Sequence, residues 1–229
     1  MTKLWPNADT AVADIPSGST LMLGGFGLCG IPETLIHALL RTDATDLHTI
    51  SNNMGVDGAG MGLLLEQDRI ASHIGSYVGE NKLLERRVLD GSLKLTLTPQ
   101  GTLAERIRAG GAGIPAFYTP TGAGTLAADG KETRDFNGKA HVLETALTAD
   151  FALIHAYRAD RFGNLQFRKA ARNFNPVMAT ASRCTIAEVE EFSEAALNPD
   201  QIHTPGIYVH RLVPCTECTK RIERRTTRA

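Results

Sequence analysis

Six residues near the N-terminus have the types and spacing of a loop that could bind an anionic ligand. The string is Gly25-Phe-Gly-Leu-Cys-Gly30, which follows a short apolar run and precedes an amphipathic stretch that starts after Pro32. Such a loop offers backbone N–H groups and a helix N-terminus to a negative group. Dinucleotide-binding loops also need an acidic residue after the next strand, where this sequence has Ser51-Asn-Asn53. Dinucleotide binding is therefore the weaker interpretation, and a structural loop or another ligand stays open.

Three amide side chains follow predicted strands at the same edge of the predicted sheet. Asn52 and Asn53 come after the strand at residues 47–51, and Gln100 comes after the strand at residues 93–97. The carboxyl ends of parallel strands form the ligand crevice of an open α/β sheet. Amides there can donate hydrogen bonds to a carbonyl oxygen that gains charge. Each motif alone is equally compatible with a turn, but together with the glycine loop they favour a site.

Other chemistries have weak support in the sequence. Cys215 and Cys218 form half of a zinc-binding pattern without a second pair, and the seven histidines show no close metal-ligand spacing, so we predict no metal site. Residues 124–131 have one residue too many for a phosphate-binding P-loop. The sequence contains no G-x-S-x-G nucleophile motif. Cys29 is more simply explained as a small residue in tight backbone than as a reactive thiol.

The elements that must position these residues alternate between apolar runs and amphipathic stretches. Strands are predicted at residues 20–24, 47–51, 69–78, 93–97, 151–155 and 184–189, and helices at residues 33–40, 80–90 and 102–109. Asn137-Gly138 lies between two further strand-like runs and predicts a β-hairpin in the second half. This order predicts an α/β fold with an open, mostly parallel sheet flanked by helices, in a single domain over residues 1–229.

Composition excludes several classes of partner. The chain has 229 residues, 24 Lys and Arg against 25 Asp and Glu, and a net charge of −1, which gives no overall attraction to nucleic acid or to an anionic membrane. No apolar run approaches the roughly 20 residues of a membrane span, and the N-terminus does not resemble a signal peptide. Four scattered cysteines do not suggest a disulfide framework. We therefore expect a cytoplasmic protein whose basic tail, residues 220–228, is solvated or faces a neighbouring protein chain.

Several motifs together resemble a known enzyme family. They are Gly24-Gly-Phe-Gly-Leu-Cys-Gly-Ile-Pro-Glu33, Ser51-Asn-Asn53, Ser76-Tyr-Val-Gly-Glu-Asn81, Pro99-Gln-Gly-Thr-Leu-Ala-Glu-Arg106, Arg168-Lys-Ala-Ala-Arg-Asn-Phe-Asn-Pro176 and Ile207-Tyr-Val-His-Arg-Leu212. The combination resembles the alpha subunit of family I coenzyme A transferases, and the likeness extends over almost the whole chain. It implies an open α/β sheet in an enzyme that usually contains two alpha and two beta chains.

The resemblance also implies how the work is divided between the chains. The family's catalytic glutamate lies in a Ser-Glu-Asn-Gly motif of the beta chain, and this sequence has no such motif. The nearest echo, Gly79-Glu80-Asn81, lacks the serine and the following glycine, and we interpret Glu80 as the start of a helix. A partner beta subunit would therefore supply the nucleophile for ping-pong transfer.

Site roles follow from the same resemblance. Asn52, Asn53 and Gln100 would support catalysis by facing the acyl group and the partner's glutamate. The loop that binds coenzyme A would consist of Gly24, Gly25, Phe26, Gly27, Leu28, Cys29 and Gly30. Coenzyme A would be a substrate, with no resident cofactor. The preferred exchange is from succinyl-CoA to a 3-oxoacid, acetoacetate, with 3-oxoadipate or acetate as alternatives.

Two hypotheses from other classes stay open at this point. A nicotinamide-dependent oxidoreductase would use the glycine loop for a dinucleotide, although the acidic residue after the second strand is missing. A stand-alone binding protein would be a monomer without a beta chain.

Overall fold

A computed structural model describes residues 3–215 and contains one large and one small sheet. The large sheet has the strand order β11-β10-β8-β1-β2-β3-β4, and every neighbouring pair along this path is parallel. Strand β9 joins its side by pairing antiparallel with β8. The predicted α/β fold with a mostly parallel sheet is confirmed.

The bounds of the elements follow the alternation seen in the sequence. The strands of the large sheet are β1 (Thr20–Leu23), β2 (Leu47–Ile50), β3 (Ile70–Gly75), β4 (Lys94–Leu97), β8 (Ala149–Asp160), β9 (Leu165–Gln166), β10 (Ser182–Ser193) and β11 (Arg211–Pro214). The α-helices are α1 (Ala8–Val12), α2 (Glu33–Leu40), α3 (Gly62–Glu66), α4 (Lys82–Leu89), α5 (Gln100–Gly111) and α6 (Asn175–Thr180). Short 3₁₀ turns are η1 (Leu126–Ala128), η2 (Lys169–Arg172), η3 (Pro199–Gln201) and η4 (Gly206–Tyr208).

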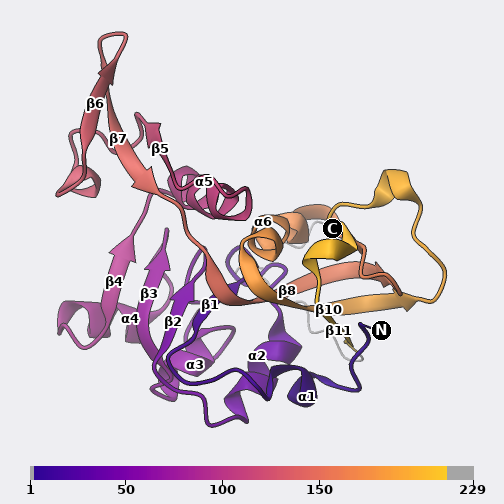
Figure 1. Cartoon of the computed structure of the whole chain (residues 1–229). Helices are drawn as coiled ribbons and strands as arrows, with labels where there is room; N and C mark the ends of the chain where they lie inside the picture. The colour runs from indigo at the N-terminus through magenta and orange to yellow at the C-terminus, as the bar shows by residue number, and fades with distance from the viewer. Residues whose placement is uncertain (1–2, 216–229) are drawn as a thin grey trace, which may run out of the picture.

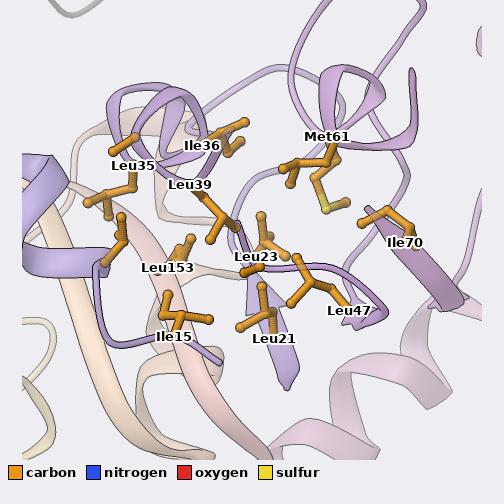
Figure 2. Close-up of a cluster of buried hydrophobic side chains, with 14 of the residues drawn as sticks. Ile15, Leu21, Leu23, Leu35, Ile36, Leu39, Leu47, Met61, Ile70 and Leu153 are labelled. Carbon is orange, nitrogen blue, oxygen red and sulfur yellow. The ribbon is translucent and has the colours of Figure 1, made fainter. Parts of the chain in front are cut away.

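Helices cover both faces of the large sheet, with α1 to α4 on one face and α5 and α6 on the other (Figure 1). Alternate residues of each strand therefore enter different cores, as the two-residue period of a strand requires. Leu21 and Leu23 of β1 point into the core under α2, together with Leu153 of β8 (Figure 2). Met22 points to the opposite face, into the core formed with α5 and α6. Burial on both faces explains why these strands read as continuous apolar runs.

The second half contains the predicted hairpin. Strands β6 (Thr133–Phe136) and β7 (Lys139–Thr145) pair antiparallel around Asn137-Gly138, and β5 (Ala116–Thr119) completes a three-stranded sheet that projects from the body (Figure 1). Asn137 and Gly138 have φ angles of 55° and 77°, the pair of positive values that the favoured two-residue hairpin turn needs. The hairpin prediction is confirmed.

The strand order places a topological switch point between β1 and β8. From β1 the chain winds outward to β2, β3 and β4, and from β8 it winds the other way to β10 and β11. Ligands of open α/β sheets bind where the connections diverge in this way, outside the carboxyl ends of the strands. The loop that leaves β1 at this point is the glycine loop of residues 24–30. The fold therefore favours the same loop that the sequence singled out.

Some predicted bounds were wrong. Helix α5 begins at Gln100 rather than Thr102, and it continues through Gly110 and Gly111 instead of ending there. These two glycines allow close packing: a Cβ on Gly110 would lie 2.0 Å from the Leu147 carbonyl oxygen, and a Cβ on Gly111 would lie 2.4 Å from Thr180 Oγ1. The predicted strands at residues 151–155 and 184–189 are the central parts of the twelve-residue strands β8 and β10.

The predicted role of Glu80 as a helix start was also wrong. Helix α4 begins at Lys82, and Asn81 is its N-cap residue, with the Asn81 Oδ1 atom accepting a hydrogen bond from Leu84 N at 2.8 Å. Glu80 precedes this cap with a φ of 69°, in the left-handed region. A cap residue needs extended backbone, which Asn81 has, so Glu80 belongs to the turn before the helix.

One buried histidine makes stability depend on pH. His73 on β3 is 1% exposed, its Nδ1 atom lies 3.0 Å from Thr49 Oγ1, and its Nε2 atom has no partner within residues 3–215. Burial lowers the pKa of His73 to about 4, although the contact with Thr49 acts in the opposite direction. Below pH 6.5 the unfolded chain binds a proton that the folded chain refuses, so stability falls with pH down to about 4.

We expect His73→Gln to flatten this dependence. A pKa lowered to about 4 corresponds to roughly 3 kcal/mol of unfolding free energy lost between pH 6.5 and 4. Urea unfolding at pH 7 and pH 4.5 measures the loss in the parent chain and in the variant. His48→Gln, which changes an exposed histidine on neighbouring β2, is the matched control. An equal loss in the His73 variant would show that other groups cause the acid sensitivity.

Candidate active site

The glycine loop after β1 is a tight turn that only glycine-rich sequences can form. Phe26 and Cys29 exchange two backbone hydrogen bonds of 3.0 Å, which folds the four residues between β1 and α2 back on themselves. Gly25, Gly27 and Gly30 have φ angles of 114°, 59° and 69°. L-residues with a Cβ rarely adopt these values, so the glycines are needed for the shape of the turn. Phe26 at its tip is 48% exposed.

A segment from the far end of the chain holds this loop from behind. Asn173 Nδ2 donates to the Cys29 carbonyl at 3.0 Å, and Asn175 Nδ2 donates to the Gly30 carbonyl at 2.9 Å. Gly24 is equally close, because a Cβ there would lie 1.8 Å from Asn175 Oδ1. Residues 168–176 thus act as a clamp on the loop, a role that we did not predict. Amide-rich composition was the only local signal, and the contact depends on the tertiary fold.

Asn52 connects the glycine loop to the end of β3. Its Oδ1 atom accepts from Gly27 N at 3.5 Å, the long limit of a hydrogen bond, and its Nδ2 atom donates to Ser76 Oγ at 2.9 Å. Ser76 Oγ donates back to the Asn52 carbonyl at 3.0 Å. Asn52 is only 4% exposed. Its side chain therefore holds neighbouring loops together, and any hydrogen bond to a substrate would come in addition to this role.

Asn53 lies beside the same loop. It is 7% exposed and pairs through its backbone with Tyr77, which is 51% exposed. Asn52 and Asn53 line a small cavity together with Gly24, Gly25 and Gly27. The volume of this cavity is about 10 Å³, enough for no more than one water molecule. The glycine loop and the asparagine pair are thus packed against each other, and a large ligand would lie over their outer surface.

A second glycine turn follows β2, and sequence analysis missed it. Val56 and Ala59 exchange backbone hydrogen bonds of 3.3 and 3.2 Å, as Phe26 and Cys29 do in the first turn. Three glycines in this turn, Gly55, Gly58 and Gly60, have φ angles of 69°, 74° and 62°. The signal was present in the repeated spacing, since residues 25–30 and 55–60 each begin and end with glycine after a strand. The two turns meet where Gly60 faces Leu28, with its Cβ position 3.2 Å from Leu28 Cδ2.

Gln100 is placed differently from the asparagine pair. It is the first residue of α5, next to the N-cap Pro99, and it is exposed. In the described part of the chain its side chain makes no hydrogen bond, so it does not cap its own helix. Strand β4, which precedes it, is separated from β2 by β3. The structure thus brings Asn52 and Asn53 to the glycine loop, and it puts Gln100 at the same sheet edge, two strands away, with a free amide.

The described residues hold no candidate metal centre. Within residues 3–215 no group of three His, Cys, Asp or Glu side chains is arranged to bind an ion. No helix in this part of the chain is long and apolar enough to span a membrane. Cys218 and the basic tail at residues 220–228 lie outside the described residues, so the expectations about the Cys215–Cys218 pattern and the tail stay predictions.

Comparisons with known proteins agree on one family. A family model described as coenzyme A transferase matches residues 6–214. The chain is 61% identical to the A-type polypeptide of the succinyl-CoA:3-ketoacid coenzyme A transferase of Xanthomonas campestris pv. campestris strain B100, over 99% of this chain and 94% of that protein. It is 54% identical to the corresponding polypeptide of the enzyme with the same name in Helicobacter pylori strain J99, over 100% of this chain and 99% of that protein.

A solved structure shows the same fold. The acyl-CoA transferase of Escherichia coli O157:H7, solved as a thioester complex with CoA, superimposes with a TM-score of 0.84 at 22% identity. The match covers 96% of this chain and 48% of that chain. This chain therefore spans about half the length of the E. coli enzyme.

Proposed function

The chain belongs to the coenzyme A transferase family, whose model matches residues 6–214, and we propose that it is the alpha subunit of an enzyme that moves coenzyme A from succinyl-CoA to acetoacetate. The observation that carries this proposal is the glycine loop at the β1/β8 switch point, packed against Asn52 and Asn53. The two relatives named for succinyl-CoA and a 3-ketoacid support the choice of substrates. Nothing found supports the nicotinamide-dependent alternative, because Asn52 and Asn53 stand where a dinucleotide site needs an acid.

The loop would bind coenzyme A on its outer side. Exposed Phe26 and the positive-φ glycines leave the backbone open to a ligand there, while the inner side is filled by the clamp and by Asn52. Coenzyme A then takes part as a substrate and leaves with the product, so no resident cofactor is needed. Asn53 and Gln100 are proposed to point donors at the acyl group from the same sheet edge.

The nucleophile would come from the partner beta subunit. Its glutamate carboxylate attacks the acyl-CoA carbonyl, which gives a mixed anhydride and releases the coenzyme A thiolate. The thiolate attacks the glutamyl carbonyl, forming a glutamyl thioester and releasing succinate. Acetoacetate then attacks the thioester, and the thiolate returns to the acetoacetyl carbon, which regenerates the glutamate. Each half-reaction passes through a carbonyl oxygen with negative charge, which amide donors such as Gln100 can stabilise.

Assembly and location are part of the same proposal. Two alpha and two beta chains would form a heterotetramer, which the mass of the purified complex in solution measures. A cytoplasmic location follows from the substrates, which are intracellular metabolites in this proposal.

The proposal is tested with the reconstituted pair of chains. Succinyl-CoA is offered with acetoacetate, 3-oxoadipate or acetate, and formation of the new acyl-CoA is followed. We expect acetoacetate to give the highest kcat/KM. A clear preference for 3-oxoadipate or acetate would move the enzyme to a different acid, and no transfer to any acid would contradict the function itself.

Gly27 offers a test of the loop's contact with coenzyme A. Its φ of 59° would strain valine, but asparagine tolerates the left-handed region. Gly27→Asn therefore adds a side chain at the loop without changing its backbone, and we expect the KM for acyl-CoA to rise about tenfold with little change in melting temperature. Gly91→Asn is the matched control, because Gly91 has a φ of 77° and open space around it after α4. An unchanged KM in the Gly27 variant would place coenzyme A elsewhere.

A further inference from the structure

A buried histidine lies between two carboxylates close to the glycine loop. His155 on β8 is 6% exposed and stands opposite Glu188 of β10 in the parallel register. Its Nδ1 atom lies 2.9 Å from Glu188 Oε1, and its Nε2 atom lies 3.1 Å from Glu190 Oε1. Ionised carboxylates only accept hydrogen bonds, so both ring nitrogens must carry protons to satisfy them. Burial alone would lower the pKa of His155, but the hydrogen bonds and charges of Glu188 and Glu190 outweigh it and raise this pKa.

Glu188 in turn anchors the helix that follows the glycine loop. Its second oxygen, Oε2, accepts from Leu35 N at 3.0 Å, in the first turn of α2. The N-cap residue of α2 is Pro32, which makes no side-chain cap within the described chain. Glu188 is 2% exposed and takes over this function from another strand. A carboxylate at a helix N-terminus satisfies an open N–H group and interacts favourably with the helix dipole.

The same histidine also contacts the clamp behind the loop. His155 N donates to Asn175 Oδ1 at 3.0 Å, and Asn175 passes the connection on to the Gly30 carbonyl. Residue 155 is therefore joined to the end of the loop through Asn175, and to the start of α2 through Glu188. Both connections bear on the short segment from Gly30 to Leu35.

We propose that His155 and Glu188 are positioning residues for coenzyme A transfer: the imidazolium fixes the Glu188 carboxylate, which holds the N-terminus of α2 and thereby the glycine loop in the conformation that binds acyl-CoA. The proposal rests on the proposed function, because it takes the loop to be the acyl-CoA site. Neither residue touches the reacting atoms. Their loss is expected to act on binding of acyl-CoA and to leave binding of the acceptor acid unchanged.

Two substitutions of Glu188 separate its hydrogen bonds from its size and charge. Glu188→Ala removes the cap of α2, and we expect the KM for acyl-CoA of the assembled enzyme to rise at least fivefold. Glu188→Gln can keep both bonds: the amide oxygen accepts from Leu35 N, and the amide nitrogen donates to His155 Nδ1, whose Nε2–H still faces Glu190. The KM of the glutamine variant should therefore stay within about twofold of the parent value. Recovery by glutamine is a result that loss of packing alone would not give.

Control variants keep the test decisive. Glu191→Ala removes an exposed ion pair with Arg158 on the same strand but has no connection to α2, so its KM for acyl-CoA should not change. If Glu188→Ala does not assemble with the partner, His155→Gln takes its place, since it leaves the cap in position but loosens it. A KM for acyl-CoA that stays at the parent value in the Glu188→Ala or His155→Gln enzyme would overturn the proposal, and so would an equal rise for the acceptor acid.

Failure of this inference can be told apart from failure of the proposed function. If Gly27→Asn raises the KM for acyl-CoA and the Glu188 and His155 variants do not, the loop is the acyl-CoA site but His155 does not position it. If the parent enzyme transfers no coenzyme A, the proposed function itself is contradicted.

Discussion

Replacing Gln100 with alanine is expected to lower the turnover of the reconstituted enzyme by at least tenfold. The side chain is exposed at the first position of α5, and the N–H groups of that helix end point the same way. A neutral amide can stabilise the developing oxyanion without binding the nucleophilic carboxylate as tightly as a cation would. Loss of one such donor costs on the order of 10²–10³ in turnover in other enzymes. Initial rates at saturating substrate measure the effect.

Melting temperature on the same preparation separates catalysis from structure. Gln100 makes no side-chain hydrogen bond within residues 3–215, so its replacement should leave the melting temperature nearly unchanged. Gln201→Ala, at an exposed glutamine in η3, is the matched control and should affect neither quantity. A Gln100 variant that melts earlier and turns over at the parent rate would assign this residue a structural role.

The chain on its own is expected to show no transferase activity. It has no Ser-Glu-Asn-Gly motif, and the one echo of it, at Gly79-Glu80-Asn81, is a turn in which Asn81 is committed to capping α4. Without a nucleophilic carboxylate the ping-pong reaction has no first step. Mixing the chain with succinyl-CoA and acetoacetate should give no acetoacetyl-CoA above the blank.

Addition of the partner beta chain provides the positive control for this experiment. The same preparation of this chain should become active when the beta chain is added, and activity should saturate at a fixed ratio of the two. Turnover by this chain after removal of all other polypeptides would mean that it carries its own nucleophile.

The parts of the fold that could be predicted are those set by local sequence. Strands β1 to β4 lie where short apolar runs predicted them, and the most central of these runs are buried on both faces and bounded by turn residues. The hairpin at Asn137-Gly138 could be predicted because its positive φ angles need these residue types. The glycine loop was recognisable for the same reason. Local steric rules were sufficient for each of these.

The parts that could not be predicted depend on contacts between distant segments. The position of β8 next to β1 creates the switch point, yet no local pattern encodes which strands become neighbours. Asn173 and Asn175 reach the glycine loop only because α6 folds back onto it. The full lengths of β8 and β10 include polar residues such as His155 and Glu188, which are buried because they pair with each other. Sequence periodicity treats such residues as strand ends.

The central claim is that this chain binds acyl-CoA while its partner carries the nucleophile, and the most direct test is to locate the covalent intermediate. The assembled enzyme is incubated with succinyl-CoA in the absence of an acceptor acid, and the mass of each separated chain is then measured. We predict that the partner chain gains the mass expected for a coenzyme A thioester and that this chain keeps its parent mass. A coenzyme A adduct on this chain instead would contradict the account.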